Sequence, residues 1–134
     1  MNQFEDNFAQ SNASEKWNAY GYLRLSHEDG DKEESNSITG QKNLIREYFR
    51  HHPEIIACGM KIDDGFSGSS FDRPAFQEMM ADVKMGRINC IVVKDLSRFG
   101  RNYLEAGEYI ERIFPFLGVR FIAINDNYDS MNTR

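Results

Sequence analysis

The run Tyr20-Gly21-Tyr22-Leu23-Arg24-Leu25-Ser26 is strand-like and ends in an arginine and a serine two residues apart. Because side chains at i and i+2 point to the same face of a strand, Arg24 and Ser26 should lie side by side at its carboxyl end. A guanidinium beside a hydroxyl suits a site that holds an anion, such as a phosphodiester, while the oxygen attacks it. The alternative for this pair alone is a strand end with a solvated arginine and a turn serine.

Around this run, the chain alternates between predicted strands and predicted helices. Apolar composition predicts strands at residues 17–26, 55–63, 88–93 and 119–124. Amphipathic helices are expected at residues 37–51, from Pro74 until Gly86 stops the helix, and at residues 103–117, where Pro115 should end or kink the helix. This alternation predicts an α/β fold: a three-layer domain with a central, largely parallel sheet of about four to five strands flanked by helices.

The predicted helices carry apolar stripes that should face the sheet. One member of the first stripe is polar, because Gln41 shares a face with Ile38, Ile45 and Tyr48. Such a glutamine is usually a hydrogen-bonded filler or a residue at the rim. The buried faces expected for the other two helices consist of Phe76, Met79, Met80 and Val83, and of Tyr103, Ala106, Ile110, Ile113, Phe114 and Leu117.

Length and composition are those of an ordinary globular protein. The 134 residues are 40% hydrophobic and 28% charged, which fits one domain. We find no apolar run long enough to span a bilayer and no signal-peptide pattern, so no membrane is expected and the cytoplasm is the expected location. Cys58 and Cys90 both lie in apolar runs, where buried free thiols are expected, and no histidine stands near them at metal-ligand spacing.

The net charge of −5 is unevenly distributed. Residues 1–35 contain eight acidic and three basic residues, whereas the rest of the chain contains 13 of each. We expect residues 1–16 to form a mobile acidic leader. A neutral core with clustered arginines can still bind phosphate locally, although tight DNA binding would need positive charge from elsewhere.

Ligands of open α/β sheets bind at the carboxyl ends of the strands. Three segments should meet at that edge here: Arg24 and Ser26 after the first strand, residues 64–67 after the second and residues 95–101 after the third. Together they bring hydroxyls, carboxylates and guanidinium groups to one place. This convergence favours a functional site around Ser26 over a plain strand end.

Two further arginines, Arg98 and Arg101, belong to the third segment. If a helix begins near Phe99, both should emerge near one face of its positive N-terminal end, where an anion is favoured. Together with Arg24 they could neutralise the charge that develops on phosphate oxygens during phosphoryl transfer. The alternative is an exposed helix start with solvated cations.

Several common catalytic motifs do not occur in the sequence. We find no Gly-rich nucleotide-binding loop, no HExxH zinc motif and no GxSxG elbow. The histidines His27, His51 and His52 fall in loop or helix-end positions, which disfavours a Ser-His-Asp triad. A serine nucleophile would then lose its proton to Asp64, to a water or to an unusually placed arginine, and the sequence does not choose between these acceptors.

Four motifs follow one another along the chain. They are Tyr22-Leu23-Arg24-Leu25-Ser26; Ser37-Ile38-Thr39-Gly40-Gln41; Asp64-Gly65-Phe66-Ser67-Gly68 with Asp72-Arg73-Pro74; and Leu96-Ser97-Arg98-Phe99-Gly100-Arg101. In this order they resemble the catalytic domain of the serine recombinases, the resolvase/invertase family. The similarity covers residues 17–128. The long acidic loop expected at residues 27–36 and the sequence of residues 94–102 look most like the large serine recombinases of mobile elements.

The resemblance implies a resolvase-like fold and a site-specific DNA recombinase that integrates, excises or resolves a mobile element. In this family a serine cleaves DNA to a 5′-phosphoserine intermediate and a free 3′-hydroxyl, and the strands are exchanged and rejoined without a metal or nucleotide cofactor. The implied partners are double-stranded recombination sites and further copies of the chain, as a dimer and a tetramer. Carried over by position, the implied site residues are Ser26 as nucleophile, Arg24, Arg98 and Arg101 around the phosphate, and Gln41, Asp64, Ser67 and Arg73 in supporting positions.

Two features depart from the family pattern. Ser97 stands where many resolvases have an aspartate, with an acid two places earlier at Asp95, so the resemblance assigns neither residue a role. The family also has a long dimer helix and a DNA-binding region after the last strand. Residues 129–134 are therefore expected to begin the connection to such a region.

Two rival interpretations are open at this point. Asp63, Asp64 and Asp95 could hold Mg²⁺ in a metal-dependent nuclease or phosphatase. The chain could instead be an assembly module that has kept the fold and lost the chemistry. The presence of Ser26 together with all three arginines argues against the second of these.

Overall fold

The computed structural model describes residues 16–26 and 36–132. Its sheet has five strands in the order β2-β1-β3-β4-β5. These are β1 (Trp17–Leu25), β2 (Ile55–Asp64), β3 (Cys90–Val93), β4 (Arg120–Ala123) and β5 (Tyr128–Asp129). The first four run parallel, and β5 is antiparallel to β4. This confirms the predicted α/β fold and its largely parallel sheet, whereas β5 lies in a polar segment for which the sequence predicts no strand.

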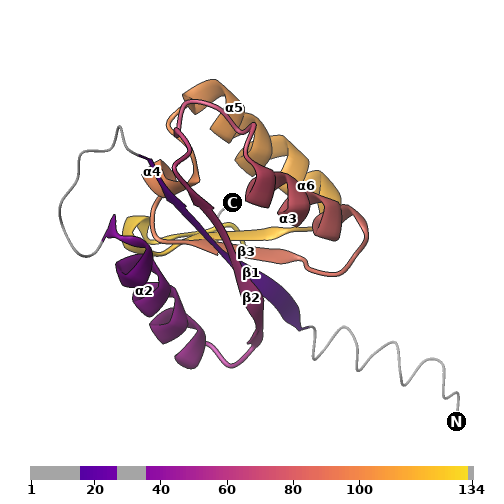
Figure 1. The fold of residues 1–134 in the computed structure, drawn as a ribbon. Coiled ribbons are helices and arrows are strands. Elements are labelled where there is room, and N and C mark those ends of the chain that lie inside the picture. Colours follow the sequence, from indigo (N-terminus) through magenta and orange to yellow (C-terminus); the bar gives the residue numbers. More distant parts are fainter. Residues whose placement is uncertain (1–15, 27–35, 133–134) are drawn as a thin grey trace, which may run out of the picture.

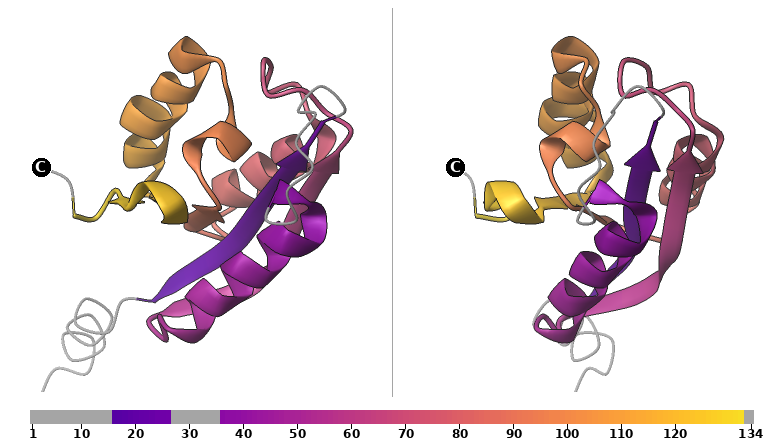
Figure 2. Two further views of the ribbon diagram at one scale, coloured as in Figure 1. Left: turned by 90° about the vertical axis from the view of Figure 1, so that its left-hand side faces the viewer. Right: turned by 60° about the vertical axis from the view of Figure 1, so that its left-hand side comes forward.

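Helices cover both faces of the sheet (Figures 1 and 2). One face is covered by α2 (Ile38–Arg50). The other is covered by α3 (Pro74–Lys84) and by a helical segment made of α5 (Tyr103–Glu108), the π-helical turn η3 (Tyr109–Ile113) and α6 (Phe114–Leu117). Two short turns, α4 (Leu96–Phe99) and the 3-10 turn η4 (Ile124–Asp126), follow β3 and β4. The domain is therefore three-layered, as predicted.

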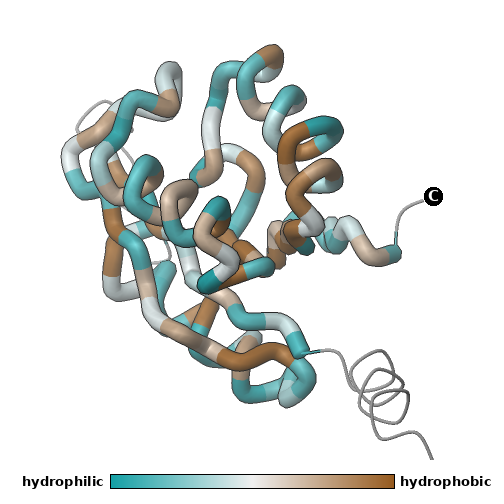
Figure 3. The backbone as a smooth tube through the Cα atoms, turned by 90° about the vertical axis from the view of Figure 1, so that its right-hand side faces the viewer, coloured by the Kyte–Doolittle hydropathy of each residue, from teal (hydrophilic) through white to brown (hydrophobic). Residues whose placement is uncertain are grey.

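Successive side chains of β1 point to opposite faces of the sheet and so enter two different hydrophobic cores. Ala19 and Leu23 pack with Ile45 of α2 in the smaller core, whereas Tyr22 packs with Phe76 of α3 in a larger one rich in aromatic rings. All four residues of β3 are buried, as its central place in the sheet requires. Figure 3 shows runs of hydrophobic residues along the central strands.

The last helical segment continues past Pro115 to Leu117, so this proline does not end the helix, which was one of the two expected outcomes. Proline lacks an N–H, and in a regular α-helix its ring clashes with the carbonyl four residues earlier. Here the wider turn η3 comes first, so that the Phe114 N–H bonds to the Tyr109 carbonyl and Pro115 stands in the first turn of α6. Because the π turn inserts an extra residue, the apolar stripe changes face. Tyr103, expected to be buried, is 90% exposed, and Tyr109 packs against the core instead.

Other expectations are met in part. Cys90 is buried in β3, but Cys58 is exposed, since it lies in the exposed middle of the edge strand β2. The expected leader at residues 1–16 lies outside the described residues except for Lys16, and the acidic loop expected at residues 27–36 does so except for Asn36. Among the helices that the structure describes, none is both long and apolar enough to cross a membrane.

Candidate active site

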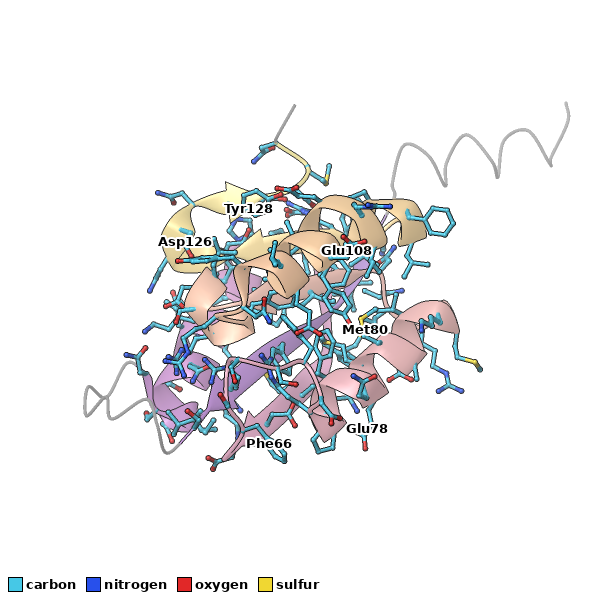
Figure 4. The ribbon with its side chains drawn as sticks, turned by 90° about the horizontal axis from the view of Figure 1, so that it is seen from above. Phe66, Glu78, Met80, Glu108, Asp126 and Tyr128 are labelled. Carbon is cyan, nitrogen blue, oxygen red and sulfur yellow. The ribbon has the colours of Figure 1, made fainter. Side chains whose placement is uncertain are left out.

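The carboxyl ends of β1, β2 and β3 meet at one edge, where the sequence predicts a site. Ser26 follows β1 directly and is buried, with 7% of its surface exposed. Phe66 belongs to the loop after β2 and Asp126 to the turn after β4, on opposite sides of β1 in the sheet order. Seen from above, the two residues lie on either side of the end of β1 (Figure 4). The end of β1, which Ser26 follows, therefore lies between the loop after β2 and the turn after β4.

Arg24 is fully buried and braces two of these loops. Its Nη1 donates to the carbonyl of Phe66 at 3.1 Å. Its Nη2 donates to the carbonyl of Ser97 at 2.8 Å, and its Nε to the carbonyl of Arg98 at 3.1 Å. The guanidinium thus holds the loop after β2 against the turn after β3 through backbone carbonyls, a role that the sequence does not predict.

Gln41, the polar member of the apolar stripe, is fully buried and hydrogen-bonded to the strand that bears Ser26. Its Oε1 accepts from the N–H of Arg24 at 3.3 Å, and its Nε2 donates to the carbonyls of Arg24 at 3.0 Å and Asn36 at 2.9 Å. Since β3 pairs with β1 only from Ala19 to Gly21, the amide supplies hydrogen bonds that a neighbouring strand would otherwise make. Gln41 thereby fixes the backbone two residues before Ser26.

Arg98 and Arg101 reach this edge on a tighter turn than predicted. Arg98 lies inside the four-residue helix α4, where Asp95 Oδ1 accepts from the Arg98 N–H at 2.8 Å and Gly100 ends the helix. The next helix begins only at Tyr103. The expectation that both arginines stand at the start of a long helix is therefore wrong, because this capped turn separates them from it.

The three arginines are nevertheless neighbours: Arg98 bonds to Arg24, and Arg24 and Arg101 meet beside Gly68. Arg98 is 6% exposed, and its Nη1 donates to the carbonyl of Arg24 at 3.3 Å. The exposed Arg101 donates its backbone N–H to the carbonyl of Gly68 at 2.7 Å. A Cβ atom at Gly68 would lie 2.7 Å from Nη2 of Arg24 and 2.9 Å from Nε of Arg101. A glycine thus leaves the space in which these two guanidinium groups approach each other.

Asp64 and Ser67 lie on the β2 side of the same edge. Asp64 is exposed and pairs in register with Leu25, the residue before Ser26. Ser67 lies in the loop after β2, where its Oγ accepts from the N–H of Ser69 at 3.1 Å and so shapes the turn. Both residues are thus brought to the predicted edge, with Asp64 beside the strand that carries Ser26.

Arg73 is buried and bonded to protein groups. Its Nη1 donates to the Tyr22 hydroxyl at 3.0 Å and to the carbonyl of Phe99 at 2.8 Å, and its Nε to the carbonyl of Ser70 at 2.7 Å. The Tyr22 hydroxyl donates in turn to Asp63 at 2.7 Å. Burial raises the pKa of Tyr22 above its ordinary value, so this hydroxyl stays protonated and remains a donor. Arg73 therefore ties β1 to the loops that surround Ser26.

Buried charge at this edge is mainly positive. In the described part of the chain, Arg24, Arg73, Lys94 and Arg98 are each at most 6% exposed, and Asp63 is the buried carboxylate. Cations buried in excess of carboxylates cost free energy unless hydrogen bonds or an anion compensate for their lost hydration. Carbonyls accept hydrogen bonds from Arg24 and Arg73 but carry no full negative charge, so the net positive charge of this edge favours an anion such as a phosphate group.

The carboxylates considered for a metal site serve other purposes. Asp63 caps α3, because its two carboxylate oxygens accept from the N–H groups of Ala75 and Phe76, both at 2.9 Å. Asp95 caps α4. Within residues 16–26 and 36–132, no three His, Cys, Asp or Glu residues are grouped so that they could hold a metal ion. A metal site on Asp63, Asp64 and Asp95 is therefore not favoured.

Sequence reasoning missed three participants at this edge: Tyr22, the capping role of Asp63, and Lys94. Tyr22 shares a face of β1 with Arg24 and Ser26, so the period of two could have found it. The bond from Asp63 to α3 joins elements whose packing the sequence does not specify. Lys94 has no signal beyond its place next to the last strand-end motif.

Comparisons with known proteins agree with this fold. Residues 19–134 match the family model described as "Resolvase, N terminal domain". The fold is similar to the N-terminal catalytic domain of TP901-1 integrase, with a TM-score of 0.76, 23% identity, and coverage of 87% of this chain and 83% of that one. It is also similar to a resolvase family site-specific recombinase from Streptococcus pneumoniae, with a TM-score of 0.71, 29% identity, and coverage of 89% and 79%.

A third solved structure has a similar fold at a lower TM-score. The C-terminal catalytic domain of ISC1926 TnpA, an IS607-like serine recombinase, matches with a TM-score of 0.64 and 21% identity, over 79% of this chain and 68% of that one. In all three cases the similarity covers at least 79% of this chain. The fold that brings Ser26 and the arginines to one edge is therefore a recurring one.

Proposed function

Because this chain belongs to the resolvase family of site-specific DNA recombinases, we propose that Ser26 is the nucleophile with which it cuts a DNA strand. One observation carries this proposal: Ser26 ends the strand whose Arg24 is bonded to the backbone of Arg98, beside Gly68, where Arg101 also arrives. A hydroxyl at the edge of the sheet where these guanidinium groups gather can attack a phosphodiester whose developing charge they neutralise.

The proposed reaction exchanges one phosphate ester for another. Ser26 Oγ forms a bond to phosphorus and loses its proton, while the bond from phosphorus to the DNA 3′ oxygen breaks and that oxygen takes up a proton. The products are a 5′-phosphoserine link and a free 3′-hydroxyl. Rejoining is the reverse attack by a 3′-hydroxyl, so the phosphodiester is restored without ATP.

The supporting residues divide by what they contact. Arg101, the exposed member of the arginine group, is proposed to meet the phosphate directly, together with Arg98. Arg24 and Gln41 hold the end of β1 and the loops beside it, Ser67 shapes the loop after β2, and Arg73 ties that loop to β1. Asp64 stands nearest along β2 and is proposed to assist the proton transfer of Ser26.

The substrate is proposed to be double-stranded DNA at a recombination site, bound by a dimer and rejoined in a tetramer. Residues 17–128 are proposed to be the catalytic domain, and the residues from 129 onward to lead into a dimer helix and a DNA-binding region. The family model's description as an N-terminal domain supports this order. The likeness to the TP901-1 integrase domain supports the large class of serine recombinases.

The test uses a recombinase chain that includes the DNA-binding region and DNA spanning the junctions of its own element, in EDTA. The DNA is labelled at the 3′ end in one sample and at the 5′ end in another, then quenched in detergent and run on a denaturing gel. We expect the 3′-labelled strand to move to a protein-linked band and the 5′-labelled strand to give a short free fragment. Ser26→Ala should lose both, whereas Ser70→Ala, an exposed matched control, should keep them.

A different pattern would contradict the assignment. Cleavage that gives free ends, requires Mg²⁺ and survives Ser26→Ala would point to carboxylate-bound metal chemistry instead. Loss of the protein-linked band in both serine variants would mean that the substitutions disturb the fold, and the melting temperatures of the two proteins separate that case.

A further inference from the structure

Lys94 is a buried cation next to the site that no step of the proposed reaction uses. It follows β3 directly and precedes the turn that carries Arg98. Its side chain is 8% exposed. Lysines are almost never buried unless they are paired, because the ammonium group loses its hydration. Its partners therefore indicate why it lies there.

The partners of Lys94 lead toward the strand that bears Ser26. Its Nζ donates to the side-chain oxygen of Asn36 and lies 3.8 Å from a carboxylate oxygen of Asp95. The backbone carbonyl of Asn36 accepts from Gln41 Nε2 at 2.9 Å. The same nitrogen donates to the carbonyl of Arg24 at 3.0 Å. Lys94 is thus linked to the backbone of β1 through one residue and one side-chain amide.

We propose that Lys94 is a positioning residue of the cleavage site, which holds Asn36 so that the Gln41 amide fixes the end of β1 beneath Ser26. The role rests on the proposed function of Ser26. Gln41 Nε2 divides its two hydrogens between the carbonyls of Asn36 and Arg24, so a displaced Asn36 removes one of the two acceptors that orient the amide. A catalytic hydroxyl displaced by about 1 Å can cost about 100-fold in rate.

The position of the charge agrees with this role. Lys94 contacts Asp95, and Asp95 also caps the turn on which Arg98 lies. The ammonium group therefore contacts both supports of the site, the end of β1 through Asn36 and the arginine turn through Asp95. A neutral side chain of the same length would leave the Asn36 oxygen without this donor.

The test measures single-turnover formation of the protein-linked DNA band by the recombinase chain with its DNA-binding region. The variants are Lys94→Met, Asn36→Ala, the double variant and Lys84→Met, which makes the same change at an exposed lysine of α3. Melting temperature and DNA affinity are measured for each. We expect Lys94→Met and Asn36→Ala each to slow cleavage about tenfold or more at saturating DNA, with DNA affinity within twofold of the parent and Lys84→Met unchanged.

The double variant decides how Lys94 acts. If Lys94 works through Asn36, the two losses are not additive, and the double variant cleaves about as fast as the slower single variant. The proposal would be overturned if the rate losses of the two single variants multiplied in the double variant, or if folded Lys94→Met cleaved at the wild-type rate. A rate loss fully explained by the unfolded fraction would overturn it as well. If the unsubstituted protein forms no protein-linked band, the proposed function fails first, and this role falls with it.

Discussion

The hydroxyl of Tyr22 accepts a hydrogen bond from Nη1 of Arg73 at 3.0 Å and donates one to Asp63 at 2.7 Å. All three side chains are buried. The tyrosine thus stands between a cation and a carboxylate that have lost their water, and it joins β1 to the N-terminus of α3, which Asp63 caps. Removing this hydroxyl leaves both charged partners short of a bond, which costs more than the bond itself contributes.

We therefore expect Tyr22→Phe to lower the free energy of unfolding by about 1–3 kcal/mol. Urea denaturation at pH 7 measures it. Tyr20→Phe is a matched control, because Tyr20 lies two residues earlier on the same strand and bonds to Asp82 in a more exposed setting. Its effect should be smaller. Equal effects for the two variants would mean that the buried network does not contribute as described.

Arg24 and Arg101 should respond differently to the same substitution. Arg24→Lys removes the guanidinium group that donates to three backbone carbonyls. Both the free energy of unfolding and the cleavage rate should therefore fall, the first by about 2 kcal/mol or more. Arg101→Lys, at an exposed side chain, should lower cleavage at least tenfold and leave stability nearly unchanged. Urea melts together with the protein-linked band assay separate the two. A stable Arg24→Lys protein would contradict the bracing role.

The contrast between these arginines shows which parts of the site the sequence can predict. Period-two spacing in β1 and the rule for strand ends predict the place of Arg24 and Ser26 correctly, because both follow from local geometry. The acceptors of Arg24 do not follow, since they belong to loops at residues 66 and 97–98 whose conformations depend on packing between distant segments. The same holds for Arg98, whose turn is closed by the Asp95 cap before any long helix begins.

The helix predicted at residues 103–117 is present, but its buried face is wrong at Tyr103 for a different reason. A stripe drawn at 3.6 residues per turn assumes an unbroken α-helix, and η3 adds a residue just before Pro115. The stripe therefore predicts Tyr103 in the core and omits Tyr109. Gln41, by contrast, is a polar misfit for which the sequence leaves two options, a hydrogen-bonded filler or a residue at the rim, and the structure shows the first.

Gly68 should be intolerant of a side chain for functional reasons. In Gly68→Ala the new Cβ meets the guanidinium groups of Arg24 and Arg101 at less than 3 Å. Arg24 is held by three carbonyls, so Arg101 has to move, and we expect cleavage to fall at least tenfold while the protein still folds. Gly107→Ala is the control, because nothing lies within 4 Å of its Cβ and alanine favours a helix by about 1 kcal/mol. Wild-type cleavage by Gly68→Ala would show that the arginines need no such space.

The pH dependence of stability should contain a contribution from Asp129 on β5. Arg120 donates to its two carboxylate oxygens, from Nε at 3.1 Å and from Nη2 at 2.6 Å. Burial alone would raise the pKa of Asp129, but the bonds from Arg120 and from the Met131 N–H outweigh it and hold this pKa below its ordinary value. In the unfolded chain the same carboxyl titrates near pH 4. The unfolded state therefore binds more protons in this range. The contribution of Asp129 to the free energy of unfolding is complete above about pH 4 and is lost as the pH falls through the lower, folded pKa.

We expect Asp129→Asn to have a lower free energy of unfolding than the parent at pH 6, and urea melts should show this difference shrinking as the pH falls below about 4. A gap that stays constant from pH 6 to pH 2 would mean that the pairing with Arg120 does not lower the pKa of Asp129.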